Sequence, residues 1–324
     1  GIRCLERGVL LTEGAPFACP ADEKRMPETG PYALSRLRWR VVRSLWARGP
    51  SRDSRLRAVL ENPRSPRVRA VAKLTKRSAR QETGLFLLEG PQAAREALAY
   101  RPDTLVEIFA TPTALEKHTD VRDAAKDAGL EVVYTTEAVL DAMADTVTPQ
   151  GIVAVARQSP TSVREIFAAS PRLVAICEEV RDPGNLGTII RAADAAGADA
   201  VILTGRTVDP YNPKVVRATT GSLFHVPVAV GVDLSTAVEK AHAAGVRVIA
   251  ADVGGGDFLE SRDVLAGPTA WLFGNEARGL EEDALALADL SLRLPIYGAA
   301  ESLNLATAAS VCLYETAFAQ RAAR

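Results

Sequence analysis

The sequence predicts an α/β protein built from two domains, and three observations support this. Its 324 residues are enough for about two domains of ordinary size. Short apolar runs alternate with helical patterns twice along the chain, first in residues 56–157 and again in residues 172–324. In the second stretch the runs are continuously apolar, which is typical of parallel strands covered by helices on both faces.

Residues 1–55 are expected to form a flexible or unassigned N-terminal extension. They mix Gly, Pro and Arg without a sustained period, apart from a short helix predicted around Tyr32–Ala47. They hold no apolar run suited to a secretory signal, and their acidic residues argue against an organellar presequence. No stretch of the chain approaches roughly 18 consecutive apolar residues. We therefore expect a cytoplasmic protein without a membrane span.

The alternation of strand and helix patterns in residues 56–157 predicts a small α/β domain. Val68, Val71 and Leu74 fall on one face of a helix whose other positions are largely basic. Residues 158–171 are expected to be a linker. The predicted strands of this domain are Leu85–Leu88, Leu105–Ala110, Glu131–Tyr134 and Gly151–Ala156, and its predicted helices are Gln92–Ala99 and Ala114–Ala128.

Residues 172–324 predict the second domain, with a parallel sheet and a last helix at about Leu303–Ala322. The Gly254–Gly256 run is expected to be a flexible loop, because Leu259 stands where a dinucleotide-binding fingerprint needs its third glycine. The predicted strands are Leu173–Glu178, Ala200–Leu203, Val228–Val230, Val246–Ala250, Ala270–Phe273 and Leu290–Leu294.

The charge distribution indicates a polyanionic partner. The formal net charge is only −1, yet residues 35–80 hold 15 basic and 2 acidic side chains. Such a block on an otherwise acidic chain favours a nucleic acid, and a solvated arginine-rich arm is the alternative. The candidate phosphate contacts are Arg64, Arg67, Arg69, Lys73, Lys76, Arg77 and Arg80.

Several kinds of chemistry are disfavoured. The four cysteines lie far apart and the three histidines do not pair at i, i+4, so neither a disulfide framework nor a bound metal is expected. The chain has no P-loop motif and no G-x-S-x-G nucleophile elbow.

Polar side chains follow three of the predicted strands, at the edge where parallel sheets bind ligands. The segment 181–191 holds Asn185 and Arg191, the segment 274–280 holds Glu276, and the segment 294–306 holds Ser302 and Asn304. Each has a structural alternative, with Asn185 or Ser302 as a helix cap, Arg191 as a surface charge, and Glu276 paired with Arg278 in solvent. Three such segments in one sheet favour a functional site.

Together these segments resemble the motifs of the SpoU (TrmH-type) RNA ribose 2′-O-methyltransferases of the SPOUT superfamily. Residues 185–191 resemble the family's N-x-G-x-x-x-R motif, residues 273–279 its F-G-x-E-x-x-G motif, and residues 295–304 its P-x₆-S-L-N motif. Residues 212–222 resemble its N-P-K-x-x-R-x-x-x-G element. The resemblance covers about residues 60–320 and leaves residues 1–55 unmatched.

The resemblance implies a fold, a cofactor and an assembly. Residues 172–324 would form a parallel-sheet SPOUT domain with a deep trefoil knot, and residues 56–157 an L30e-like α/β/α substrate-binding domain. S-adenosyl-L-methionine would bind inside the knot of a homodimer. Leu305, Ala309, Cys312 and Leu313 of the last helix would serve the dimer interface or pack on the sheet. The residues expected around the cofactor are Thr204, Gly205, Phe273, Gly274, Leu294, Ile296 and Leu303.

The resemblance also implies methyl transfer to a ribose 2′-hydroxyl of RNA. A guanidinium has a pKa above about 12, so Arg191 is expected to clamp a substrate phosphate and the developing alkoxide. The general base stays open among Arg191, Glu276 and water. The expected substrate is 23S ribosomal RNA, and the alternatives are a tRNA 2′-O-methyltransferase and a non-catalytic RNA-binding protein. The catalytic set implied is Asn185, Arg191, Glu276, Ser302 and Asn304.

Overall fold

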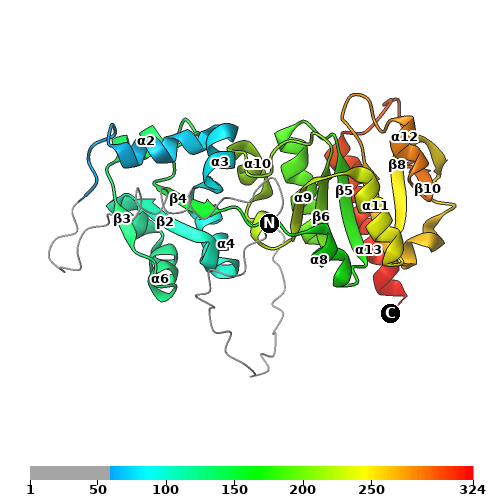
Figure 1. The fold of residues 1–324 in the computed structure, drawn as a ribbon, viewed down its shortest axis with the longest axis horizontal. Helices are drawn as coiled ribbons and strands as arrows, with labels where there is room; N and C mark the ends of the chain where they lie inside the picture. The colour runs from blue at the N-terminus through cyan, green and yellow to red at the C-terminus, as the bar shows by residue number, and fades with distance from the viewer. Residues whose placement is uncertain (1–58, 324) are drawn as a thin grey trace, which may run out of the picture.

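The computed structural model describes residues 59–323, which form two β-sheets that follow one another along the long axis of the molecule (Figure 1). The extension 1–55 and the helix expected at Tyr32–Ala47 lie outside the described residues. The first sheet has four strands in the order β1-β4-β2-β3, and the second has six in the order β10-β8-β9-β5-β6-β7. The α/β fold class is confirmed.

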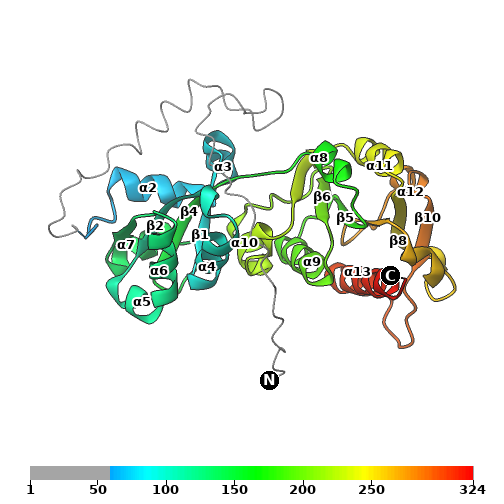
Figure 2. The same cartoon turned by 90° about the horizontal axis from the view of Figure 1, so that it is seen from below.

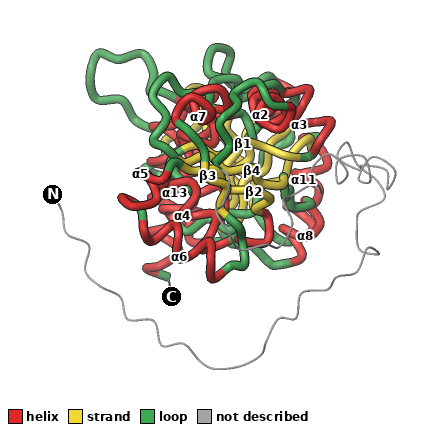
Figure 3. Tube along the Cα trace, turned by 90° about the vertical axis from the view of Figure 1, so that its left-hand side faces the viewer, coloured by secondary structure: helices red, strands yellow, loops and turns green. Residues whose placement is uncertain are grey.

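The first sheet is mixed and is covered on both faces. β4 pairs antiparallel with β1 and β2, and β2 pairs parallel with β3. Figure 3 shows α2 and α7 on one side of its strands and α4 and α6 on the other. The strands are β1 (Leu85–Glu89), β2 (Leu105–Ala110), β3 (Val132–Tyr134) and β4 (Ile152–Arg157). The helices are α2 (Pro66–Ala72), α3 (Arg77–Thr83), α4 (Pro91–Tyr100), α5 (Pro112–Lys117), α6 (Thr119–Asp127) and α7 (Glu137–Met143).

Two expectations for this region change in detail. The single helix predicted over Ala114–Ala128 is wrong, because His118 has non-helical dihedral angles (φ −117°, ψ 62°) and separates α5 from α6. The expected apolar face of Val68, Val71 and Leu74 is buried. However, α2 ends at Ala72, so Leu74 lies in a following 3₁₀ turn rather than in the same α-helix.

The second sheet is parallel throughout, as its continuous apolar strands predict. Helices α9 (Pro183–Ala196) and α13 (Leu305–Ala322) cover one face. Helices α8 (Val163–Ala168), α11 (Leu234–Ala243) and α12 (Glu282–Ala286) cover the other. The strands are β5 (Leu173–Glu178), β6 (Ala200–Thr204), β7 (Val228–Val232), β8 (Arg247–Asp257), β9 (Thr269–Phe273) and β10 (Leu290–Arg293).

Two expectations for the second half need correction, and an alternative left open for the last helix is decided. The linker 158–171 contains α8, because Val163, Ile166 and Phe167 are buried against the second sheet. The run Gly254–Gly256 is part of the long strand β8 rather than a free loop. In the last helix Ala309, Cys312 and Leu313 are buried against the sheet, so packing within the chain explains them.

Helix α10 (Pro213–Thr219) lies between the two sheets (Figure 2). It packs on α9 of the second sheet and on β1 of the first. Gly187 makes the crossing with α9 possible, because a Cβ there would lie 2.4 Å from the Cβ of Ala218. Within residues 59–323, no helix is long and apolar enough to cross a membrane.

Candidate active site

Three side chains from different segments form one hydrogen-bonded chain at the carboxyl edge of the second sheet. Glu276 follows β9, and its carboxylate accepts hydrogen bonds from the backbone N–H groups of Arg181 (3.1 Å) and Asp182 (2.9 Å). The Asn185 amide donates to Glu276 Oε1 at 3.3 Å. The Asn304 amide donates to Asn185 Oδ1 at 2.9 Å. The three sequence motifs therefore meet at one point.

The capping residues that hold this chain differ from those expected. Asp182 is the N-cap of α9 and accepts from the N–H of Asn185 at 2.7 Å. Asn185 therefore lies inside the first helical turn, and its side chain is free to bridge Glu276 and Asn304. Asn304 rather than Ser302 caps α13, with its Oδ1 accepting two backbone N–H groups. Both capping expectations are thus corrected.

The Glu276 carboxylate is held in its charged form. Partial burial raises its pKa, but the hydrogen bonds from Arg181, Asp182 and Asn185 outweigh this, and the net pKa lies below the usual value. Its acceptor positions are already used by backbone and amide donors. Glu276 is therefore suited to positioning the first and third segments and poorly suited to accepting a proton.

Arg191 lies on the exposed face of α9, two turns beyond Asn185. Its guanidinium makes no hydrogen bond or ion pair with any residue of the described range 59–323. A solvated guanidinium on an exposed helix face is available to bind an anionic group such as a phosphate.

A cavity of about 340 Å³ opens beside this chain, against the middle of β8 and the ends of β9 and β10. This volume is in the usual range for a small-molecule site. Gly274 is required beneath it, because a Cβ there would lie 2.5 Å from the backbone of Gly279. The apolar part of the wall comprises Phe273, Leu292, Leu294, Ile296, Leu303 and Leu305.

Five of the seven residues expected around the cofactor line this cavity, and two do not. Thr204 is fully buried and donates to the backbone oxygen of Cys177 at 3.2 Å. Gly205 lines a separate, neighbouring pocket instead. Thr204 ends β6 and Gly205 follows it, and β5 separates β6 from β9 in the sheet. The structure places Ala251, Asp252 and Val253 in the wall, and the glycine run after them was the sequence signal that could have identified them.

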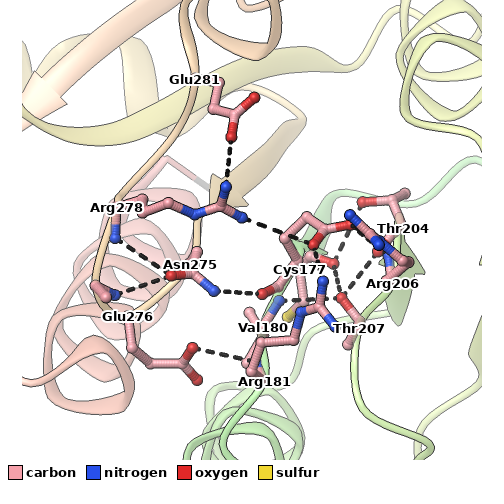
Figure 4. A network of polar contacts seen from close by, with 12 residues as sticks. Cys177, Val180, Arg181, Thr204, Arg206, Thr207, Asn275, Glu276, Arg278 and Glu281 are labelled. Carbon is pink, nitrogen blue, oxygen red and sulfur yellow. Dashed lines mark hydrogen bonds and ion pairs between the residues drawn. The ribbon is translucent and has the colours of Figure 1, made fainter.

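The turn after β9 is fixed against the loop after β5 (Figure 4). The Asn275 amide donates to the backbone oxygen of Glu179 at 2.8 Å. Arg278 forms ion pairs with Glu281 at 3.0 Å and with Glu179 at 3.9 Å. The alternative pairing of Glu276 with Arg278 does not form, so Glu276 is left to the hydrogen-bonded chain.

The seven candidate phosphate contacts of residues 64–80, here called the basic segment, divide into structural and exposed members. Arg80 is 2% exposed and pairs with Asp209, so it cannot contact a phosphate, and this expectation is corrected. Arg67 pairs with Glu107 and lies 5.4 Å from the centre of the Phe109 ring. The members whose side chains are exposed are Arg64, Arg69, Lys73, Lys76 and Arg77.

A parallel sheet with a cavity at one edge, bordered by the hydrogen-bonded chain Glu276–Asn185–Asn304 and by the exposed Arg191, has the layout of an α/β enzyme that binds a small ligand beside its strands. Residues 172–314 match the family model of the SpoU rRNA methylases, and residues 65–154 match that of the MRM3-like substrate-binding domain. The chain belongs to the SpoU rRNA methylase family.

Named relatives agree with this assignment. The chain is 36% identical over 264 residues to the 23S rRNA (guanosine(2553)-2′-O)-methyltransferase RlmP of Bacillus subtilis, covering 79% of this chain and 97% of that protein. The AdoMet-bound rRNA methyltransferase of Sinorhizobium meliloti superposes with a TM-score of 0.69 at 31% identity, over 80% of this chain and 97% of that one. The SpoU methyltransferase AviRb of Streptomyces viridochromogenes, in complex with AdoMet, gives 0.70 at 29% identity, over 80% and 100%.

Proposed function

We propose that this protein transfers the methyl group of S-adenosylmethionine to a ribose 2′-hydroxyl of 23S ribosomal RNA. The observation that carries the proposal is the hydrogen-bonded chain Glu276–Asn185–Asn304, which joins all three motifs beside the cavity. The names of RlmP and of the AdoMet-bound relatives support the substrate and the donor. The cavity's volume and apolar walls fit an adenosyl group.

The side chains have separate tasks in this reaction. S-adenosylmethionine supplies a methyl group already activated on a sulfonium, so the protein must chiefly align the acceptor and remove one proton. Arg191 holds a substrate phosphate and stabilises the developing negative charge on the 2′-oxygen. Asn185 and Asn304 orient the ribose, and Ser302 contacts it from the cavity wall. Because Glu276 is committed to its donors, the proton passes to water.

The two halves of the chain divide binding and chemistry. Residues 56–157 bind RNA through the exposed basic side chains of the segment 64–77, residues 158–171 connect, and residues 172–324 catalyse. Long-range attraction between such a segment and phosphates supplies affinity that falls with salt. A cytoplasmic location, where ribosomal RNA is exposed to such an enzyme, belongs to the same proposal.

A homodimer and a trefoil knot complete the proposal. Support for the dimer comes from an apolar stripe that α13 leaves exposed, formed by Val311, Tyr314 and Phe318, which are 39%, 38% and 57% exposed. The Tyr314 and Phe318 rings lie 5.7 Å apart and present one aromatic surface. Exposed apolar patches of this kind mark protein interfaces. Support for the knot is limited to family membership and the all-parallel sheet.

Tritium transfer from labelled S-adenosylmethionine tests the proposal. We expect methylation of 23S ribosomal RNA and little methylation of total tRNA, with one 2′-O-methyl site found by mass spectrometry. Methylation confined to tRNA would replace the substrate. Tight RNA binding with no transfer to any RNA would instead indicate a non-catalytic RNA-binding protein.

A further inference from the structure

Strand β8 bulges outward where it meets the cavity. Ala250 pairs with Ser291 of β10, but the next paired residue on β8 is Gly256, opposite Leu292. The pairing of β8 with β9 also ends at Ala250. Residues 251–255 therefore pair with neither neighbouring strand, and they form one wall of the cavity.

Glycine closes this bulge. At Gly255 an added Cβ would lie 2.6 Å from the backbone carbon of Ser291 and 2.7 Å from the nitrogen of Leu292. Only glycine lets the strand return so close to β10. The bulge thus has a defined shape, and it sets Asp252 at the cavity.

Asp252 has acceptor capacity that the protein leaves unused. Its Oδ2 accepts a hydrogen bond from the N–H of Gly254 at 2.8 Å. Its Oδ1 accepts from no residue in the described range 59–323. The cavity's other acid, Glu276, is occupied by its backbone and amide donors. A half-buried carboxylate with a fixed orientation and a free oxygen is suited to a ligand that carries hydroxyl donors.

The order of the strands determines which part of the methyl donor lies near Asp252. β8 and β10 flank one side of β9, whereas β5 and the Asn185 end of α9 lie on the other side. The methyl group must lie on the Asn185 side, where Arg191 receives the acceptor. The adenosyl end therefore extends toward β8, where Asp252 lies between Ala251 and Val253, which also line the cavity.

We propose that the Asp252 carboxylate accepts hydrogen bonds from the ribose 2′- and 3′-hydroxyls of S-adenosylmethionine. The diol is the donor pair adjacent to the purine, and the apolar walls provide the purine's site. Asp252 lies just beyond Ala250, the last residue of β8 that pairs with β9, and in dinucleotide-binding sheets an acid likewise binds a ribose hydroxyl. This inference rests on the methyl donor assigned above.

The test is calorimetry with three nucleosides on the wild type, Asp252→Ala and Asp252→Asn. S-adenosylhomocysteine lacks the sulfonium charge of S-adenosylmethionine, and 5′-methylthioadenosine lacks both that charge and the amino acid, but all three carry the diol. We expect Asp252→Ala to weaken all three by a similar factor, of about tenfold or more. Asp252→Asn should lose less, because its amide keeps one acceptor oxygen. For the 2′-deoxy analogue of methylthioadenosine, the ratio of wild-type affinity to Asp252→Ala affinity should be smaller than for methylthioadenosine itself.

Asp257 provides the matched control, since it lies on the same strand, binds the N–H of Leu259 at 2.8 Å and does not line the cavity. Asp257→Ala should leave all three affinities unchanged. Weakening of S-adenosylmethionine alone would place Asp252 at the sulfonium, and weakening that spares methylthioadenosine would place it at the amino group. Either result, or unchanged binding, would overturn the inference. If the wild type bound none of the three, the proposed donor itself would be wrong.

Discussion

Arg80 and Asp209 form an ion pair of 2.7 Å that joins the two halves of the chain. Arg80 belongs to α3, ahead of the first sheet, and Asp209 follows β6 of the second. The guanidinium is 2% exposed, and its Nη1 also donates to the backbone oxygens of Leu74 and Thr75, each at 2.9 Å. One arginine of the basic segment thus fixes that segment to the catalytic half.

Replacing Arg80 should destabilise the fold. In Arg80→Ala the largely buried carboxylate of Asp209 loses its ion-pair partner and two backbone oxygens lose a donor, and breaking such a pair typically costs about 3–5 kcal/mol. Denaturant unfolding measures the free energy of unfolding. The exposed Arg77 is the matched control, and Arg77→Ala should change stability by no more than about 0.5 kcal/mol. Equal effects of the two substitutions would show that the ion pair contributes nothing.

Arg191 should be required for chemistry and dispensable for the methyl donor. Arg191→Ala should abolish methylation while calorimetry shows S-adenosylmethionine affinity within a few fold of the wild type, because Arg191 does not line the cavity. The exposed Arg164 of α8 serves as the control, and its alanine variant should remain active. If Arg191→Lys kept near-full activity, a simple positive charge would suffice, and bidentate hydrogen bonding of the guanidinium to the phosphate would not be needed.

Ionisation of Glu276 should make the free energy of unfolding depend on pH. Its pKa in the folded protein lies below the usual 4.5. Its charged form therefore contributes fully above about pH 4.5, and that contribution is lost as the pH falls through the folded-state value. We expect Glu276→Gln to be less stable than the wild type at pH 7, and the two unfolding free energies to converge toward pH 3. A constant difference across this range would rule out the charge as the cause.

The sequence predicted the strands best where burial alone decides them. The bounds of β2 and β5 match the prediction to the residue, because both strands are short apolar runs. Asn185, Glu276 and Asn304 were also identified correctly as meeting at one edge, because parallel strands end together.

The remaining features depend on contacts that a linear pattern does not contain. Seven basic residues look alike in sequence, and only a partner 129 positions away distinguishes Arg80 from the rest. Ser302 and Asn304 are both good capping residues, and the start of α13 at Leu305 makes Asn304 the cap. Gly254–Gly256 resembles a loop, although close approach to β10 requires glycine at Gly255.

The exposed basic side chains should supply RNA affinity without affecting chemistry. Lys73, Lys76 and Arg77 are exposed and form no ion pair within residues 59–323. Each neutralised phosphate contributes roughly 0.7–0.9 to the slope of log affinity against log salt. Replacing all three with alanine should weaken RNA binding and flatten that slope by about two to three units. The rate at saturating RNA should change little, because uniform binding lowers KM without raising kcat.

The exposed Lys240 of α11 is the control, and Lys240→Ala should leave the slope unchanged. An unchanged slope in the triple variant would show a merely solvated surface, and the RNA path would then lie over the second sheet.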